Sequence, residues 1–209
     1  MLALVAASYF SDITLTVAMT PSDFVWQGFM QGNKDGCKEW PIEGESTLSW
    51  HGKPLDYMPF VYKHPDYWKV IEQETKGTGN MLCSRKLFDD SEKAYNLTEK
   101  EMIKVENICG KLCLIGADDD TLWNTGKYIR RMDERLKKTP HKCDYEVLVY
   151  KYTHFVFPET LIKLLVPGFS KFVMKFIFKS AKEHADECRQ TRIDIDLKLR
   201  KVIREWNNM

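Results

Sequence analysis

The sequence predicts an α/β fold, a mostly parallel sheet flanked by helices, in a single domain over residues 1–209. Two apolar runs, residues 112–115 and 147–150, have the length and composition of buried strands. The stretch between them, residues 121–138, has the length and pattern of a crossover helix. Since parallel neighbours require such a crossover, both strands should end at the same edge of the sheet.

The chain opens with two short elements. Residues 1–10 form an apolar pattern that predicts a short helix. Apolar side chains then alternate with polar ones, which predicts a further strand, at Ile13, Leu15, Val17 and Met19.

A long excursion, residues 21–98, follows the first strand and is rich in glycine and aromatic residues. Excursions of this length usually serve binding or act as a lid over a site. A packed insertion without a ligand is an equally good interpretation. Helices are predicted within and just beyond it, over residues 67–75 and 91–104, the second with a capping-box start at Thr98 and Glu101.

The C-terminal part predicts two further helices. Residues 169–177 place phenylalanines on one face, and lysines line the other at positions 171, 175, 179 and 182. We expect a solvated lysine face over a core-facing apolar face rather than a membrane-surface helix. The last helix should pack on the sheet through Cys188, Ile195, Leu199, Val202 and Trp206.

Acidic residues and a histidine follow the two central strands. Asp118, Asp119 and Asp120 come after the first strand, and His154 follows the second. Reacting groups in open α/β sheets lie beyond the carboxyl ends of the strands, and an Asp that orients a His is two thirds of a hydrolytic triad. The three Asp could instead cap the helix that follows them. The other histidines, at 51, 64, 141 and 184, lack a strand-end setting and are expected to be structural.

The third member of a triad, the nucleophile, is not evident. No G-x-S-x-G turn occurs in the 209 residues. Ser8 lies within a helical pattern and has no flanking glycines. In such folds the nucleophile turn is followed by an apolar helix and then a strand, the order in which this chain begins. We therefore expect that the chain is truncated and that the nucleophile turn has been cut away ahead of Met1.

At this point the sequence resembles a known family, the C-terminal region of the acyl-CoA thioester hydrolases and bile acid-CoA:amino acid N-acyltransferases, a branch of the α/β-hydrolases. The similarity runs through residues 4–10, through 108–123 with its Asp-Asp-x-x-Trp motif, and through 152–154 with Pro158 shortly after. It continues into the last helix as far as Trp206. Thr153 and Asn124 depart from the Gly and Pro that are common in the family.

The resemblance implies that Asp120 and His154 are the catalytic acid and base of an acyl-CoA thioester hydrolase. Asp120 is preferred because it precedes Trp123 by three residues and His154 by 34, whereas counting three from Gly116 selects Asp119. The chain alone is expected to be inactive. Alternatives are an acyl-CoA:amino acid N-acyltransferase, a carboxylic ester hydrolase, and a non-catalytic binding or assembly module.

Composition limits the partners and the compartment. The 31 basic and 30 acidic residues give a net charge of +1, so the molecule has no overall electrostatic field that would attract nucleic acid. No run approaches the roughly 18 apolar residues of a membrane span. Six cysteines without a C-x-x-C pair suggest a reducing cytoplasm and no structural zinc. No cofactor is expected, with coenzyme A only as part of the substrate. An exposed sheet edge or helix face should lead to a homo-oligomer.

Overall fold

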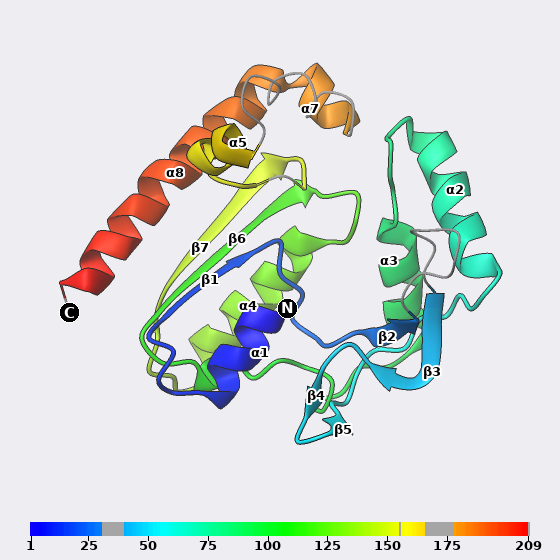
Figure 1. The fold of residues 1–209 in the computed structure, drawn as a ribbon, viewed down its shortest axis with the longest axis horizontal. Coiled ribbons are helices and arrows are strands. Elements are labelled where there is room, and N and C mark those ends of the chain that lie inside the picture. Colours follow the sequence, from blue (N-terminus) through cyan, green and yellow to red (C-terminus); the bar gives the residue numbers. More distant parts are fainter. Residues whose placement is uncertain (31–39, 155, 166–177, 209) are drawn as a thin grey trace.

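A computed structural model describes residues 1–30, 40–154, 156–165 and 178–208. Its main sheet has the order β1-β6-β7, formed by β1 (Leu15–Met19), β6 (Lys111–Asp119) and β7 (Asp144–Tyr152), all parallel (Figure 1). The predicted α/β class with a mostly parallel sheet flanked by helices is confirmed. The central strand is the most buried one, as expected where both faces are covered.

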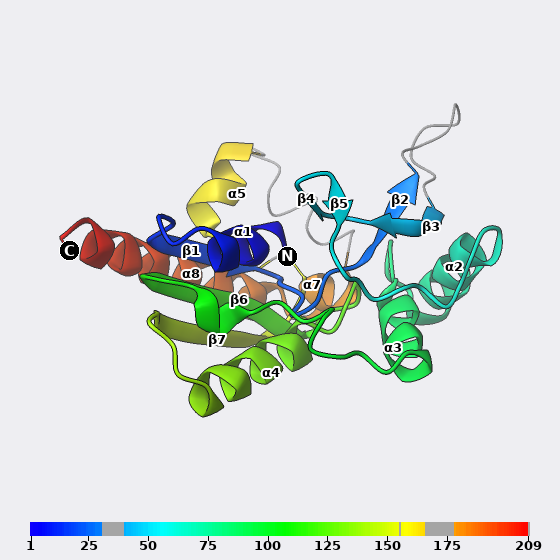
Figure 2. The ribbon, with the colours of Figure 1, turned by 90° about the horizontal axis from the view of Figure 1, so that it is seen from below.

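Helices cover the two faces of this sheet, and β6 distributes its side chains between them (Figures 1 and 2). Leu112 and Leu114 pack with α1 (Leu2–Tyr9) and α4 (Thr125–Lys138). Cys113 and Ile115 point the other way and pack with Ile195 of α8 (Ala185–Asn207). The period-two alternation of a strand therefore divides one apolar run between two layers of core.

The excursion forms a second packed unit beside α4 (Figure 1). It contains β2 (Gln27–Met30), β3 (Trp40–Ser46), β4 (Ser49–Trp50), β5 (Lys53–Pro54), α2 (Asp66–Thr78) and α3 (Arg85–Ala94). Strands β2 and β3 pair antiparallel, as do β4 and β5. Its aromatic core joins α4 where Phe24 meets Tyr128 edge-on at 5.1 Å between ring centroids. The many aromatic residues of the excursion thus serve packing.

The predicted helix over residues 91–104 is wrong in most of its length. Helix α3 ends at Ala94, and residues 105–107 form only a 3₁₀ turn, η1 (Val105–Asn107). The side chains of the predicted capping box do meet, since Glu101 Oε2 accepts from the Thr98 amide at 2.7 Å. The following backbone bonds elsewhere: the Ile103 amide donates to the Asp23 carbonyl at 2.9 Å. The Ile103 amide, which would donate to a carbonyl one turn earlier in a helix, therefore donates to a residue distant in sequence.

Other boundaries differ by a few residues. The crossover helix begins at Thr125 rather than Thr121, because the preceding residues form the turn described below. Helices α5 (Glu159–Leu165) and α7 (Lys179–Glu183) lie near α8. The amphipathic segment 169–177, with Lys171 and Lys175, lies outside the described residues.

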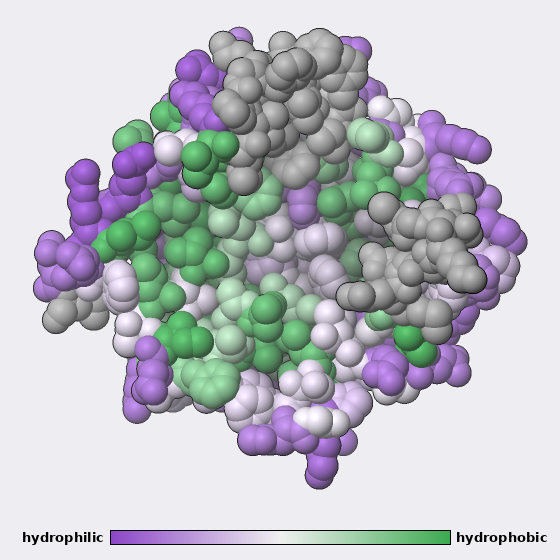
Figure 3. Space-filling view, viewed as in Figure 1, coloured by the Kyte–Doolittle hydropathy of each residue, from purple (hydrophilic) through white to green (hydrophobic). Residues whose placement is uncertain are grey.

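One surface of the described part is apolar. Hydrophobic side chains gather over α1 and β1 in Figure 3, and Leu2, Tyr9 and Phe10 are exposed there. Strand β1 pairs with β6 alone among the described strands. Among the described helices, none combines the length and the apolar character needed to cross a bilayer.

Candidate active site

Asp120 lies directly after β6, where the chain turns away from the sheet. Its side chain is fully buried. Oδ1 accepts hydrogen bonds from the amides of Leu122 at 3.0 Å and Trp123 at 3.4 Å. The carboxylate thus closes the turn that leads into α4, and the turn fixes the carboxylate.

His154 lies at the same edge of the sheet, just beyond β7. Asp119 pairs with Tyr152 in the parallel register, so the chain brings the next residues of both strands together. Thr153 has φ 69°, a left-handed backbone conformation that turns the chain before the histidine. His154 Nδ1 lies 2.9 Å from Asp120 Oδ2 and 3.0 Å from Oδ1.

The contact assigns roles to the two imidazole nitrogens. An ionised carboxylate only accepts hydrogen bonds, so Nδ1 carries a proton and donates it to Asp120. In the neutral ring, Nε2 is then the basic nitrogen. A buried carboxylate that holds this tautomer and stabilises the protonated ring is what acid-base catalysis by histidine requires.

Trp123 completes the surroundings of the imidazole. Its ring meets His154 edge-on, with centroids 4.7 Å apart and planes at 80°. The indole N–H donates to the Thr20 carbonyl at 3.0 Å, directly after β1. The ends of all three strands therefore hold the site together. In the sequence, Trp123 is a marker of spacing within the Asp-x-x-Trp motif, and its contact with His154 is not predicted.

The other two aspartates of the run have different partners. Asp118 forms a bidentate ion pair with Arg130 of α4, at 2.7 and 2.9 Å. Asp119, the alternative acid, is exposed at the end of β6. The cap of α4 is Asn124, whose Oδ1 accepts from the Lys127 amide at 3.3 Å. Asp120 is thus the aspartate that the fold brings to His154, while helix capping falls to a residue after the run.

Three of the described hydroxyl and thiol groups, those of Ser8, Cys83 and Cys188, are occupied or buried. Ser8 donates to the Val5 carbonyl at 2.8 Å within α1. Burial raises the pKa of the Cys83 thiol to about 12 and that of Cys188 to about 11. At neutral pH these thiols are protonated and are poor nucleophiles.

The remaining histidines pack against aromatic rings. His184 stacks on Tyr152 with ring centroids 4.0 Å apart, and His51, His64 and His141 each contact a Trp or Tyr ring. These contacts agree with their expected structural role. Within the described ranges, no three His, Cys, Asp or Glu side chains gather as a metal site would require.

Most of the chain matches the model of one protein family. The family model described as BAAT / Acyl-CoA thioester hydrolase C terminal matches residues 1–159. The matched segment contains the whole three-stranded sheet together with Asp120 and His154. A comparison with curated proteins found no match.

Proposed function

Because the chain belongs to the BAAT / acyl-CoA thioester hydrolase C-terminal family, we propose that it supplies the acid and the histidine of a triad that cleaves acyl-CoA thioesters. The observation that supports this role is the buried contact of 2.9 Å between Asp120 and His154 at the carboxyl edge of the sheet. Both the position and the donor–acceptor order suit a hydrolytic His–Asp pair.

In this proposal His154 Nε2 accepts the proton of a Ser or Cys nucleophile as that atom attacks the thioester carbonyl. Asp120 stabilises the imidazolium that results. The tetrahedral intermediate then collapses, the carbon–sulfur bond breaks, and His154 returns the proton to the sulfur of coenzyme A. A water molecule, activated by the same histidine, hydrolyses the acyl-enzyme and regenerates the nucleophile.

The nucleophile and the oxyanion-hole amides would come from polypeptide outside the described residues. One of those amides belongs to the residue after the nucleophile, so the two arrive together. The occupied Ser8 hydroxyl and the raised pKa of Cys83 and Cys188 support this assignment. The chain by itself should therefore release coenzyme A from acyl-CoA no faster than its His154→Ala variant.

Supplying a nucleophile segment tests the proposal directly. The strand–nucleophile segment of a family member that carries one would be fused ahead of Met1, and coenzyme A release from a long-chain acyl-CoA would be followed with a thiol reagent. We expect turnover that Asp120→Asn lowers about 10⁴-fold, since Asn favours the wrong imidazole tautomer. His154→Ala should lower it at least as far.

Neighbouring carboxylates provide the matched controls. Asp119→Asn and Asp118→Asn change the same charge within two residues of Asp120. The carboxylate of Asp118 pairs with Arg130, and among the three described aspartates it is Asp120 that hydrogen-bonds to His154. Both variants should keep turnover within a few-fold of the parent fusion. Equal losses in all three aspartate variants, or turnover by the unfused chain that exceeds the His154→Ala level, would contradict the proposal.

A further inference from the structure

The loop that carries Asp120 leaves the sheet with backbone carbonyls that no strand pairs. After β6 ends, the carbonyls of Asp120, Thr121 and Leu122 must find donors outside the ladder. All three find them in one tripeptide of the excursion, Cys83–Ser84–Arg85, at the start of α3, where the Cys83 thiol donates to the Thr121 carbonyl at 3.3 Å. We call these three residues the clamp.

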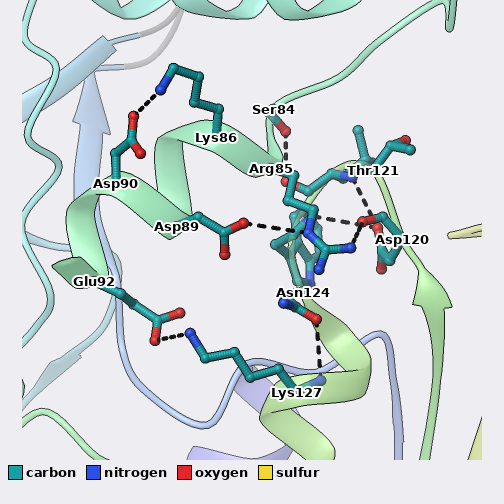
Figure 4. Close-up of polar contacts among 12 residues, drawn as sticks. Ser84, Arg85, Lys86, Asp89, Asp90, Glu92, Asp120, Thr121, Asn124 and Lys127 are labelled. Atoms are coloured by element: carbon teal, nitrogen blue, oxygen red, sulfur yellow. Dashed lines mark hydrogen bonds and ion pairs between the residues drawn. The ribbon is translucent and has the colours of Figure 1, made fainter. Parts of the chain in front are cut away.

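Ser84 and Arg85 of the clamp make a dense set of contacts with the acid loop (Figure 4). The backbone amides of Ser84 and Arg85 both donate to the Thr121 carbonyl at 3.0 Å. The Ser84 hydroxyl donates to the Leu122 carbonyl at 2.8 Å. The first amides of a helix have no partner within it, and here the acid loop satisfies those of Ser84 and Arg85 while the Lys86 amide bonds to Glu74.

Arg85 makes the contact closest to the acid. Its Nη1 donates to the Asp118 carbonyl at 3.0 Å and to the Asp120 carbonyl at 3.2 Å. One guanidinium nitrogen thus bridges the backbone on both sides of Asp119. Nε lies 3.5 Å from Asp89 Oδ2 one turn later in α3, an ion pair that restrains the side chain. Hydrogen bonds from a charged donor are stronger than neutral ones, so this bridge restrains the backbone of Asp120.

From these contacts we infer that Arg85 is a positioning residue for the site: through the backbone of the acid loop it holds the Asp120 carboxylate against His154. The inference relies on the proposed function only for the catalytic role of Asp120. This positioning role would give the excursion a part in the chemistry. The sequence did not reveal it, because Arg85 of α3 and Asp120 lie 35 residues apart in the chain.

The test is NMR on the full chain, with Arg85→Met compared against Arg130→Met. Arg130 is the matched control, since it also binds Asp118 but through the exposed carboxylate. In Arg85→Met we expect hydrogen exchange of the Leu122 and Trp123 amides, which bond to Asp120 Oδ1, to rise about tenfold or more. The downfield resonance of the His154 Nδ1 proton should broaden or disappear. Arg130→Met should leave both signals as in the parent.

A conservative variant separates positioning from general stability. Arg85→Lys keeps the charge and one donor group, so its loop exchange should fall between the parent and Arg85→Met. The inference is wrong if Arg85→Met resembles Arg130→Met, or if its exchange rises uniformly across α8 and the sheet. None of these signals depends on turnover, so an inactive fusion would count against the proposed function alone.

Discussion

At the scale of single residues, the site depends on which atoms of Asp120 are used and for what. One carboxylate accepts the Leu122 and Trp123 amides and also the Nδ1 proton of His154. The aspartate that orients the histidine therefore also closes the turn ahead of α4, while Asn124 caps the helix itself. Asp118 and Asp119 lack this geometry because their side chains are exposed.

The cysteines offer a prediction at the same scale. Burial raises the pKa of Cys83 and of Cys113 to about 12, so at pH 8 both remain thiols. Cys109 is half-buried near the start of β6. Brief treatment of the native chain with iodoacetamide at pH 8, followed by peptide mass spectrometry, should modify Cys109 and leave Cys83 and Cys113 unmodified.

Unfolding in guanidinium is the control, because all three thiols should then react alike. Rapid modification of Cys83 in the native chain would show that its thiolate is populated, and it would become a nucleophile candidate beside the acid loop.

At the scale of elements, α4 connects the sheet to the excursion. Arg131 binds the buried Asp23 carboxylate through two hydrogen bonds of 2.6 Å and also Glu92 of α3 at 2.7 Å. Its guanidinium lies 5.0 Å from the centre of the Tyr128 ring. The same helix therefore packs on β6 with one face and holds the aromatic unit with the other.

Arg131→Met should strongly destabilise the fold. It leaves Asp23 buried without its partner, and breaking a buried pair in this way costs about 3–5 kcal/mol. Urea unfolding followed by Trp fluorescence would measure the loss. Arg130→Met, one residue away in α4 but in an exposed pair, should cost at most about 1 kcal/mol. Equal losses in the two variants would mean that the Asp23 pair adds nothing beyond a surface contact.

At the scale of the whole molecule, the main feature is the side of β1 that no other described strand pairs with. The Lys111 amide donates to the Thr14 carbonyl, and the Thr20 amide donates to the Ile115 carbonyl. Since alternate residues of a strand direct their backbone groups to opposite sides, those of Leu15, Val17 and Met19 face away from β6. Unpaired strand edges next to exposed apolar side chains recruit partners.

We therefore predict that the chain associates into a dimer or larger assembly through β1 or through the exposed face of α1. Light scattering from micromolar to high micromolar concentration should show a mass that rises with concentration. Val17→Pro removes a backbone donor that faces away from β6 and should weaken association. Leu164→Ser is the control, because it removes an exposed apolar side chain elsewhere, on α5. A monomer throughout the range would rule the assembly out.

The sequence by itself determined the local order of the fold and the pairing at its edge. Apolar runs of strand length, joined by a crossover helix, require parallel neighbours, and parallel neighbours bring Asp120 and His154 to one edge. Local patterns likewise indicated the helices at residues 1–10 and 67–75 and the final helix, now α1, α2 and α8. Each of these inferences concerns residues that are close in sequence or are joined by one standard connection.

Only the tertiary structure decided the rest. The Thr98–Glu101 pattern predicts a helix, yet the Ile103 amide bonds to Asp23 and ends that possibility. Arg85 meets the acid loop, and Trp123 meets Thr20, across 35 and 103 residues. Such contacts depend on how separately formed elements pack, and no local propensity encodes them. The sequence thus determined which residues could form the Asp120–His154 pair, whereas packing determined what holds that pair in place.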